Sequence, residues 1–253
     1  MNITFLGTGT SQGVPVIACE CAVCTSNDPR DNRLRTSVLV ETADKTVVID
    51  SGPDFRFQML RQRVKKLDAI VFTHEHKDHV AGLDDVRAYN YRQQKDMDVY
   101  ATGDVQNAII REFSYIFSPI KYPGIPRVNL IEIENKPFNI GETTWLPVEV
   151  MHYKLPVLGF RIGDFTYITD AKTIEPDQLD KIRGSRVLVL NALQVGPHIS
   201  HFTLEEAIAV AREVKAERTY FTHISHLMGR HADVSRMLPK GIMLASDGLT
   251  IEL

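Results

Sequence analysis

Short apolar runs rich in Val, Ile, Thr and Phe recur along the chain and alternate with longer amphipathic segments. Runs of this composition, bounded by polar and turn-forming residues, are typical of β-strands. The first half of the chain contains four expected strands: NITFLG, TSVLVE, TVVID and DAIVFT. The second half contains six more, followed by two weaker ones: VNLIEI, TTWLPVEV, GFRIG, FTYIT, RVLVLN, RTYFT, GIMLAS and LTIEL.

Helical periodicity is clearest in two segments, DVQNAIIREFSYIF at 104–117 and TLEEAIAVAREVKA at 203–216. Within the second segment the apolar residues form one stripe at helical spacing: Leu204, Ala207, Ile208, Ala211 and Val214. Thr203 is the expected N-cap of this helix, with Glu206 at the capping-box position. FRFQMLRQRV, at 55–64, is a weaker candidate helix.

Many strands with interspersed helices, several of the strands being adjacent in the chain, favour two sheets with helices outside. Periodicity alone leaves a single doubly wound sheet open. A length of 253 residues fits one large α/β domain or two small ones. The longest region without a convincing element is 7–35, and a loop of that length is usually functional or disordered.

The composition is ordinary for a globular protein, with 43% hydrophobic residues, 24% charged residues and a net charge of −3. No basic excess points to nucleic acid as a partner. The N-terminus enters a strand-like run without the pattern of a signal peptide, and no run of eighteen apolar residues offers a membrane span. We therefore expect a cytoplasmic protein, in which thiols stay reduced.

The strongest chemical signal is VFTHEHKDHVAGL at 71–83, where an apolar strand runs directly into His74, His76, Asp78 and His79. Imidazoles at alternate positions of an extended segment point the same way. The chain is expected to enter a helix near Val80. Nitrogen and oxygen ligands of this kind suit Zn²⁺, or alternatively Mn²⁺ or Fe.

This HxHxDH motif after a strand resembles that of the metallo-β-lactamase superfamily of metal-dependent hydrolases. The resemblance covers nearly the whole chain, because later residues follow in the expected order at strand ends: His152, Asp170 and His223. It implies one domain over 1–253 with an αβ/βα sandwich fold, two mixed sheets packed face to face and helices outside. A strand-end His or Asp taken alone is more often a cap or turn former.

Carried over residue by residue, the resemblance implies two catalytic metals, Zn or Mn. His74, His76 and His152 would hold one metal, and Asp170 would bridge the pair. Asp78, His79 and His223 would hold the other. Two such cations share a hydroxide and clamp both oxygens of a displacement at phosphorus, which favours an anionic phosphodiester over a neutral amide.

All three cysteines, Cys19, Cys21 and Cys24, lie in one loop at about 16–30. An odd number excludes complete disulfide pairing, and clustered thiols of a cytoplasmic protein more often bind metal. GTGTSQGVPVIACECAVC resembles the loop of the phosphoribosyl 1,2-cyclic phosphate phosphodiesterases and of related pyrroloquinoline quinone biosynthesis proteins. That subgroup implies a structural zinc, with His226 as its fourth ligand. Reactive or merely buried cysteines are the alternative.

The glycines of GTGTSQG do not match the spacing of a dinucleotide fingerprint, so we interpret them as a tight strand exit. By resemblance to the phosphodiesterases, His201 is a catalytic residue together with Asp78. It would stabilise the anionic transition state or protonate the leaving oxygen. Of nine histidines only His198 and His231 stay unassigned. His198 is expected at the surface, with a position beside the catalytic residues as the alternative. Arg230 and His231 are expected in a surface loop, with contact to an anionic substrate as the alternative.

The predicted function is hydrolysis of a phosphodiester bond in a small cyclic sugar phosphate or nucleotide by a metal-bridging hydroxide. The first alternative is tRNA 3′-end endonuclease activity, which should come with a basic arm that the chain lacks. Thioester, lactone and β-lactam hydrolysis rank lower. The alternative of another class is a non-hydrolytic zinc protein of cofactor biosynthesis. We expect a small anionic phosphodiester as partner, no nucleic acid or membrane and, by the resemblance, a homodimer.

Overall fold

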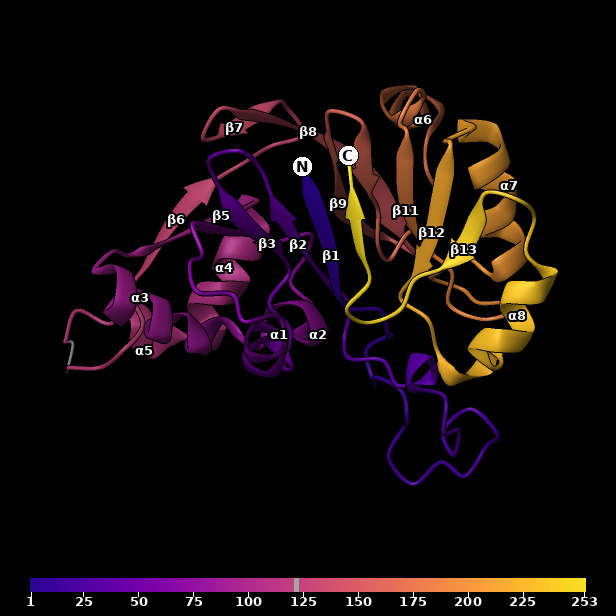
Figure 1. The fold of residues 1–253 in the computed structure, drawn as a ribbon. Coiled ribbons are helices and arrows are strands. Elements are labelled where there is room, and N and C mark those ends of the chain that lie inside the picture. The colour runs from indigo at the N-terminus through magenta and orange to yellow at the C-terminus, as the bar shows by residue number, and fades with distance from the viewer. Residues whose placement is uncertain (121–122) are drawn as a thin grey trace.

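Two β-sheets packed face to face form the centre of the protein, and helices cover both outer faces (Figure 1). The structure is a computed structural model that describes residues 1–120 and 123–253. Within these residues each sheet has seven strands. The predicted αβ/βα sandwich is therefore confirmed, and a single doubly wound sheet is excluded.

The first sheet has the strand order β14-β1-β2-β3-β4-β5-β6. Its first three pairings, β14 to β1, β1 to β2 and β2 to β3, are antiparallel, and β3 to β6 run parallel. The strands are β1 Asn2–Gly7, β2 Ser37–Glu41, β3 Thr46–Ile49, β4 Ala69–Val71, β5 Met97–Ala101, β6 Val128–Glu132 and β14 Thr250–Glu252.

The second sheet has the order β13-β12-β11-β10-β9-β8-β7. It is antiparallel from β7 to β10 and parallel from β10 to β13. The strands are β7 Phe138–Ile140, β8 Thr143–His152, β9 Leu155–Ile162, β10 Phe165–Tyr167, β11 Val187–Asn191, β12 Arg218–Thr222 and β13 Ile242–Leu244.

Helices from the first half of the chain cover the first sheet, and helices from the second half cover the second (Figure 1). The first group comprises α1 Phe55–Gln62, α2 Lys77–Val80, α3 Arg87–Gln93, α4 Gly103–Glu112 and α5 Ser114–Phe117. The second group comprises α6 Pro176–Ile182, α7 Leu204–Val214 and α8 His231–Met237.

The alternation of side chains along each strand divides the apolar residues between three layers. Val38, Val40 and Phe160 point into the layer between the sheets, where Trp145 is fully buried. The residues that alternate with them point to the opposite face of each sheet and pack under the helices, as Leu39 does in the first sheet and Leu188 in the second. Each sheet is therefore apolar on both faces, which leaves the strand ends as the place for polar chemistry.

The capping box of the 203–216 helix is confirmed. The Thr203 hydroxyl accepts from the Glu206 N–H, and the Glu206 carboxylate accepts from the Thr203 N–H. The predicted continuous helix at 104–117 is wrong, because Phe113 leaves helical backbone angles and separates α4 from α5. The turn there buries Ile116. The helix expected near Val80 begins earlier, at Lys77.

The long segment between β1 and β2 carries one 3₁₀ turn, Pro29–Asp31, within the described residues. It is joined to the second half of the chain, because Gly9 forms a β-bridge with Ile224, which follows β12. The segment GTGTSQG leaves β1 and leads into the cysteine loop, as expected. None of the helices among the described residues is both long and apolar enough to cross a membrane.

Candidate metal centre

The residues predicted as catalytic metal ligands meet where strands of both sheets end. His74 follows β4, His152 ends β8, Asp170 follows β10 and His223 follows β12. Their donor atoms form three overlapping groups, each within 4.8 Å, and Asp170 belongs to all three. The groups are Asp78, His79, Asp170 and His223; His74, His76 and Asp170; and His152, Asp170 and His201. Asp170 is therefore the geometric centre of the cluster.

The two carboxylate oxygens of Asp170 face different histidines. Oδ1 lies 3.2 Å from His223 Nε2 and 3.6 Å from His79 Nε2. Oδ2 lies 3.7 Å from His74 Nε2 and 3.3 Å from His201 Nε2. This division separates His79 and His223 from His74, as in the two ligand sets that the sequence resemblance implies.

A buried carboxylate that the sequence did not single out, Asp50, orients two of the histidines. Its Oδ2 accepts from His79 Nδ1 at 2.7 Å and from the Thr73 hydroxyl at 2.9 Å. Because that hydroxyl gives its proton to Asp50, it accepts from His74 Nδ1 at 2.9 Å. Both imidazoles therefore carry a proton on Nδ1 and direct Nε2 toward Asp170. The sequence feature that could have indicated this role is the position of Asp50 directly after the apolar run TVVI.

His152 is oriented in the same way by the backbone. Its Nδ1 donates to the carbonyl of Ser200 at 2.9 Å, which leaves Nε2 as the free acceptor atom. Three of the histidines thus have a partner that fixes the tautomer required of a metal ligand.

Several buried nitrogens of the cluster make no hydrogen bond within the described residues: His79 Nε2 and both ring nitrogens of His223. Buried polar atoms are normally satisfied, and a bound ion is one of the accepted explanations when they are not. A set of imidazole nitrogens and carboxylate oxygens also has the ligand chemistry of Zn²⁺ or Mn²⁺. The residues present therefore fit divalent metal.

The carboxylates and histidines of the cluster shift one another's pKa values. Burial works against ionisation of Asp170, but His223 and His79 hold its pKa well below the ordinary value. Burial also works against a charge on His79, yet Asp170, Asp50 and Asp78 raise its pKa well above the ordinary value. Burial lowers the pKa of His74. Asp170 is thus ionised, as a metal ligand must be, while His79 must give up a proton when metal binds.

Asp50, Asp170 and His223 all have left-handed backbone conformations, with φ of 63°, 58° and 55°. Non-glycine residues in this region cost about 1–3 kcal/mol each and cluster at functional sites. Asp50 and His223 each directly follow the last residue of a strand, β3 and β12, and Asp170 lies three residues after the end of β10. The candidate site therefore contains three residues in a strained backbone conformation.

His201 lies inside the cluster. Its ring is 4.9 Å from that of His223 and 4.5 Å from that of His152, and its Nε2 donates to Asp170 at 3.3 Å. Burial lowers its pKa to about 4. His198 is half-buried and contacts His201, with 3.3 Å between their Nδ1 atoms.

The expected surface position of His231 is wrong. Its side chain is buried, and its Nδ1 accepts a hydrogen bond of 3.0 Å from Arg33. Arg33 comes from the long segment after β1 and also donates to Thr8 and to the carbonyl of Ala245. Arg230 is exposed as expected and donates to the carbonyl of Ala22 in the cysteine loop.

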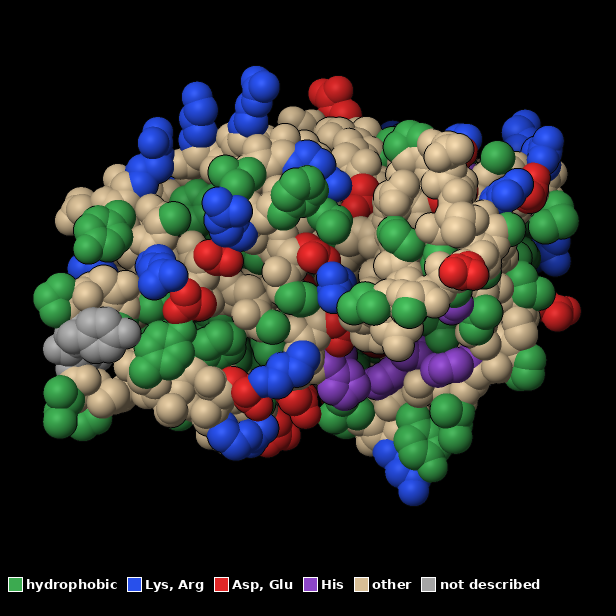
Figure 2. All heavy atoms as spheres, turned by 90° about the horizontal axis from the view of Figure 1, so that it is seen from below, with side chains coloured by type: hydrophobic (Ala, Val, Ile, Leu, Met, Phe, Trp, Pro, Cys, Tyr) green, Lys and Arg blue, Asp and Glu red, His purple; other side chains and the backbone are tan. Residues whose placement is uncertain are grey.

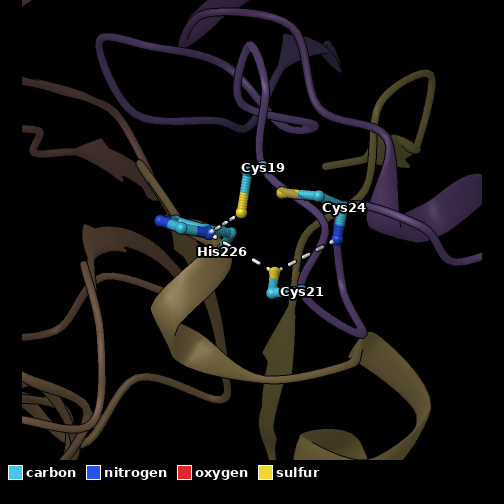
Figure 3. A group of neighbouring side chains, drawn as sticks. All are labelled: Cys19, Cys21, Cys24 and His226. Carbon is cyan, nitrogen blue, oxygen red and sulfur yellow. Dashed lines mark hydrogen bonds between the residues drawn. The ribbon is translucent and has the colours of Figure 1, made fainter.

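Cys19, Cys21, Cys24 and His226 point toward one another, with the histidine entering from the other end of the chain (Figure 3). His226 Nδ1 lies 3.3 Å from the Cys19 sulfur and 3.4 Å from the Cys21 sulfur. A tetrahedral zinc with ordinary bond lengths places such ligand atoms about 3.5–3.8 Å apart. The Cys24 N–H and His226 lower the pKa of Cys21 to about 6. The cluster therefore fits a closed zinc site.

The catalytic cluster opens to solvent through a cleft of about 560 Å³. The cleft is lined by His76, His152, Tyr153, Lys154, Leu155, Ile199 and Ser200. Figure 2 shows histidine side chains side by side at the surface on this face of the molecule. The segment RAYNYRQQKD does not line this cleft, since its Asn90, Tyr91 and Gln94 border a separate cavity.

The family model described as "Beta-lactamase superfamily domain" matches residues 45–224. A solved structure of a diphosphatase from the PhnP family is similar with a TM-score of 0.94 and 41% sequence identity, covering 100% of this chain and 97% of that chain. Zn(2+)-bound PqqB from Methylobacterium extorquens shares the fold, with a TM-score of 0.81, 19% identity and full coverage of both chains.

Among curated proteins, an octanoyltransferase of Porphyromonas gingivalis is 38% identical over 252 residues. The match covers 98% of this chain and 51% of that protein, so the chain spans about half the length of this relative.

Proposed function

The chain belongs to the beta-lactamase superfamily, as its histidine motif predicted, and from this membership we propose that it is a metal-dependent phosphodiesterase of small anionic esters. The observation that carries the proposal is the ring of seven His and Asp donors around Asp170 at the base of an open cleft. The similarity to a diphosphatase of the PhnP family supports chemistry at phosphorus rather than at a carbonyl.

Two divalent metals, zinc or manganese, would be held by residues that the structure brings together. His74, His76 and His152 would hold one; Asp78, His79 and His223 would hold the other; and Asp170 would contact both. Such metals would act as Lewis acids and lower the pKa of water.

The protein's own residues would orient the ester and determine which histidine nitrogens carry a proton. His76 and His152 line the cleft, so the reacting phosphate would lie against them. Asp50 and Thr73 hold the Nδ1 protons of His79 and His74 away from the reacting centre. His201 donates a hydrogen bond to Asp170 at the centre of the cluster, and its N–H would donate to an oxygen of a bound phosphate instead.

The second part of the proposal is a structural zinc held by Cys19, Cys21, Cys24 and His226. His226 follows His223 by three residues, so this zinc would fix the loop carrying a catalytic ligand. The site has four protein ligands and no open position, which is typical of a structural rather than a catalytic zinc.

Other activities have less support. Processing of tRNA requires basic residues that bind the phosphates of the RNA backbone, and the net charge of −3 does not favour such binding. Octanoyl transfer is the activity named for a relative of which the chain covers about half, and that match alone does not support this activity for the chain. A non-hydrolytic role in cofactor biosynthesis is the alternative that the experiment must separate.

The decisive experiment is a turnover screen of the purified chain loaded with Zn²⁺ or Mn²⁺. It compares bis-p-nitrophenyl phosphate, cyclic ribose phosphates, cyclic dinucleotides, linear dinucleotides and precursor tRNA. We expect turnover of the small diesters and none of the tRNA. Cleavage of tRNA alone would favour the endonuclease, and no turnover with either metal would favour the non-hydrolytic role.

A further inference from the structure

The outer wall of the cleft is formed by residues that the metal centre does not use. They are Tyr153 and Lys154, at the turn between β8 and β9, and Ile199 in the loop before α7. Figure 2 shows hydrophobic and basic side chains protruding beside the histidines. The cleft therefore joins the metal centre to a surface that is both apolar and cationic.

Tyr153 has a backbone conformation that does not suit it. His152 pairs with Leu155 across the hairpin, so Tyr153 and Lys154 form a two-residue turn. Tyr153 has a φ of 57°, a region in which glycine or asparagine is at ease and a bulky residue is an outlier. Its side chain is not buried either, since the residue is 53% exposed. Neither the turn nor the core therefore accounts for an aromatic side chain here.

Lys154 is the cation of this wall. Its Nζ lies 5.4 Å from the centre of the Tyr153 ring, and it has no ion pair within residues 1–120 and 123–253. Two other lysines near the metal ligands are paired, Lys77 with Glu112 and Lys172 with Glu206. The charge of Lys154 is therefore available to an anionic ligand in the cleft.

We propose that Tyr153 and Lys154 form a specificity subsite for the planar heterocycle of a nucleotide-like ester. The ring of Tyr153 would stack on the heterocycle, and Lys154 would contact an anionic oxygen beside it. Ile199, which is 67% exposed, would supply apolar contact from the other loop of the cleft. The proposal rests on the phosphodiesterase function and narrows its substrates to esters that carry a nucleoside-like group.

Two substrates with the same leaving group test this proposal: thymidine 5′-phosphate p-nitrophenyl ester and methyl p-nitrophenyl phosphate. Tyr153→Asn keeps the left-handed turn and removes the ring, whereas Tyr153→Phe keeps the ring. We expect Tyr153→Asn to lower kcat/KM for the thymidine ester about tenfold, within the range of base–aromatic stacking, and to spare the methyl ester. Tyr153→Phe should behave as the wild type, and Lys154→Gln should raise KM for the thymidine ester.

Tyr91→Asn is the matched control, because Tyr91 is an exposed tyrosine on α3 that lines a different cavity. Calorimetry of thymidine 5′-phosphate binding gives a readout independent of turnover, and Tyr153→Asn should weaken this affinity about tenfold as well. Equal effects on both esters, or unchanged thymidine binding, would overturn the subsite while the phosphodiesterase stands. If the wild type hydrolyses neither ester, the turnover screen described above decides the proposed function, and calorimetry alone decides the subsite.

Discussion

His79 and Asp50 are joined by a hydrogen bond of 2.7 Å between Nδ1 and Oδ2, and both side chains are fully buried. Asp50 follows β3 and His79 lies in α2, so the contact fixes the HxHxDH segment to the first sheet. The same carboxylate accepts from the backbone N–H and the hydroxyl of Thr73. Asp50 thus controls the orientation of the metal cluster without belonging to any of the donor groups.

Asp50→Asn should weaken binding of the catalytic metals about 10- to 100-fold, the usual effect of removing a carboxylate behind a metal-bound histidine. The amide cannot accept from His79 and Thr73 with equal strength, so the His79 tautomer is no longer fixed. Competition with a chelator measures the affinity. Asp247→Asn is the matched control, since Asp247 is a buried carboxylate bonded to Thr8 and Leu34 away from the cluster. Equal metal loss in both variants would contradict a specific role for Asp50.

Asp78→Ala and His76→Ala should each reduce phosphodiesterase turnover by more than about 100-fold while the fold survives. Each change removes one donor atom from the cluster and leaves the apolar layers untouched. Turnover of bis-p-nitrophenyl phosphate and far-ultraviolet circular dichroism are the measurements. Glu75→Ala serves as the control from within the same motif, because Glu75 belongs to none of the donor groups. Full activity in either ligand variant would refute the assignment.

Elemental analysis should find about three metals per chain, two in the catalytic cluster and one in a sulfur-rich site. Cys21→Ser should reduce the count to about two and lower the melting temperature, because a structural zinc contributes directly to folding. Thiol titration without denaturant should find the cysteines protected in the wild type. Only two metals together with freely titrating thiols would rule out the structural zinc.

The apolar runs predicted the strands, and the resemblance of the HxHxDH motif predicted the two-sheet sandwich and the residues of the site, whereas periodicity alone left a single sheet open. Polar residues after buried strands, such as His74, Asp170 and His223, must meet where parallel strands of a sandwich terminate. The role of Asp50 was not predictable, since an acid after a strand is equally typical of a turn. The burial of His231 involves a hydrogen bond with Arg33, which lies 198 residues away in the long segment between β1 and β2. Local periodicity contains no information on such a contact.

His201→Ala separates a catalytic role from a ligand role. His201 donates to Asp170 and lies within one of the donor groups, so its geometry suits either. If His201 acts on the phosphate, its replacement by Ala should reduce turnover about 10²- to 10⁴-fold while both catalytic metals stay bound. Metal content and turnover are measured on the same preparation. Loss of metal in proportion to activity would make His201 a ligand, whereas His198→Ala, a change outside the donor groups, should retain both metals.

The buried contact between Arg33 and His231 should make stability depend on pH. Burial and the charge of Arg33 lower the pKa of His231 to about 4, although Asp28 and Asp31 oppose this and Arg30 adds to it. Between about pH 6.5 and pH 4 the unfolded chain therefore binds a proton that the folded chain does not. The free energy of unfolding should fall as the pH falls through this window, by up to about 1.4 kcal/mol per pH unit.

His231→Asn tests this relationship, because the amide oxygen can accept from Arg33 in place of Nδ1 but does not titrate. The variant should lose less stability than the wild type between pH 6.5 and pH 4.5, and the two should differ by a constant amount above pH 7. Urea unfolding of both proteins at fixed metal content measures the difference, which cancels the titration of all other groups. Parallel pH profiles across the window would show that His231 does not stay neutral in the folded protein.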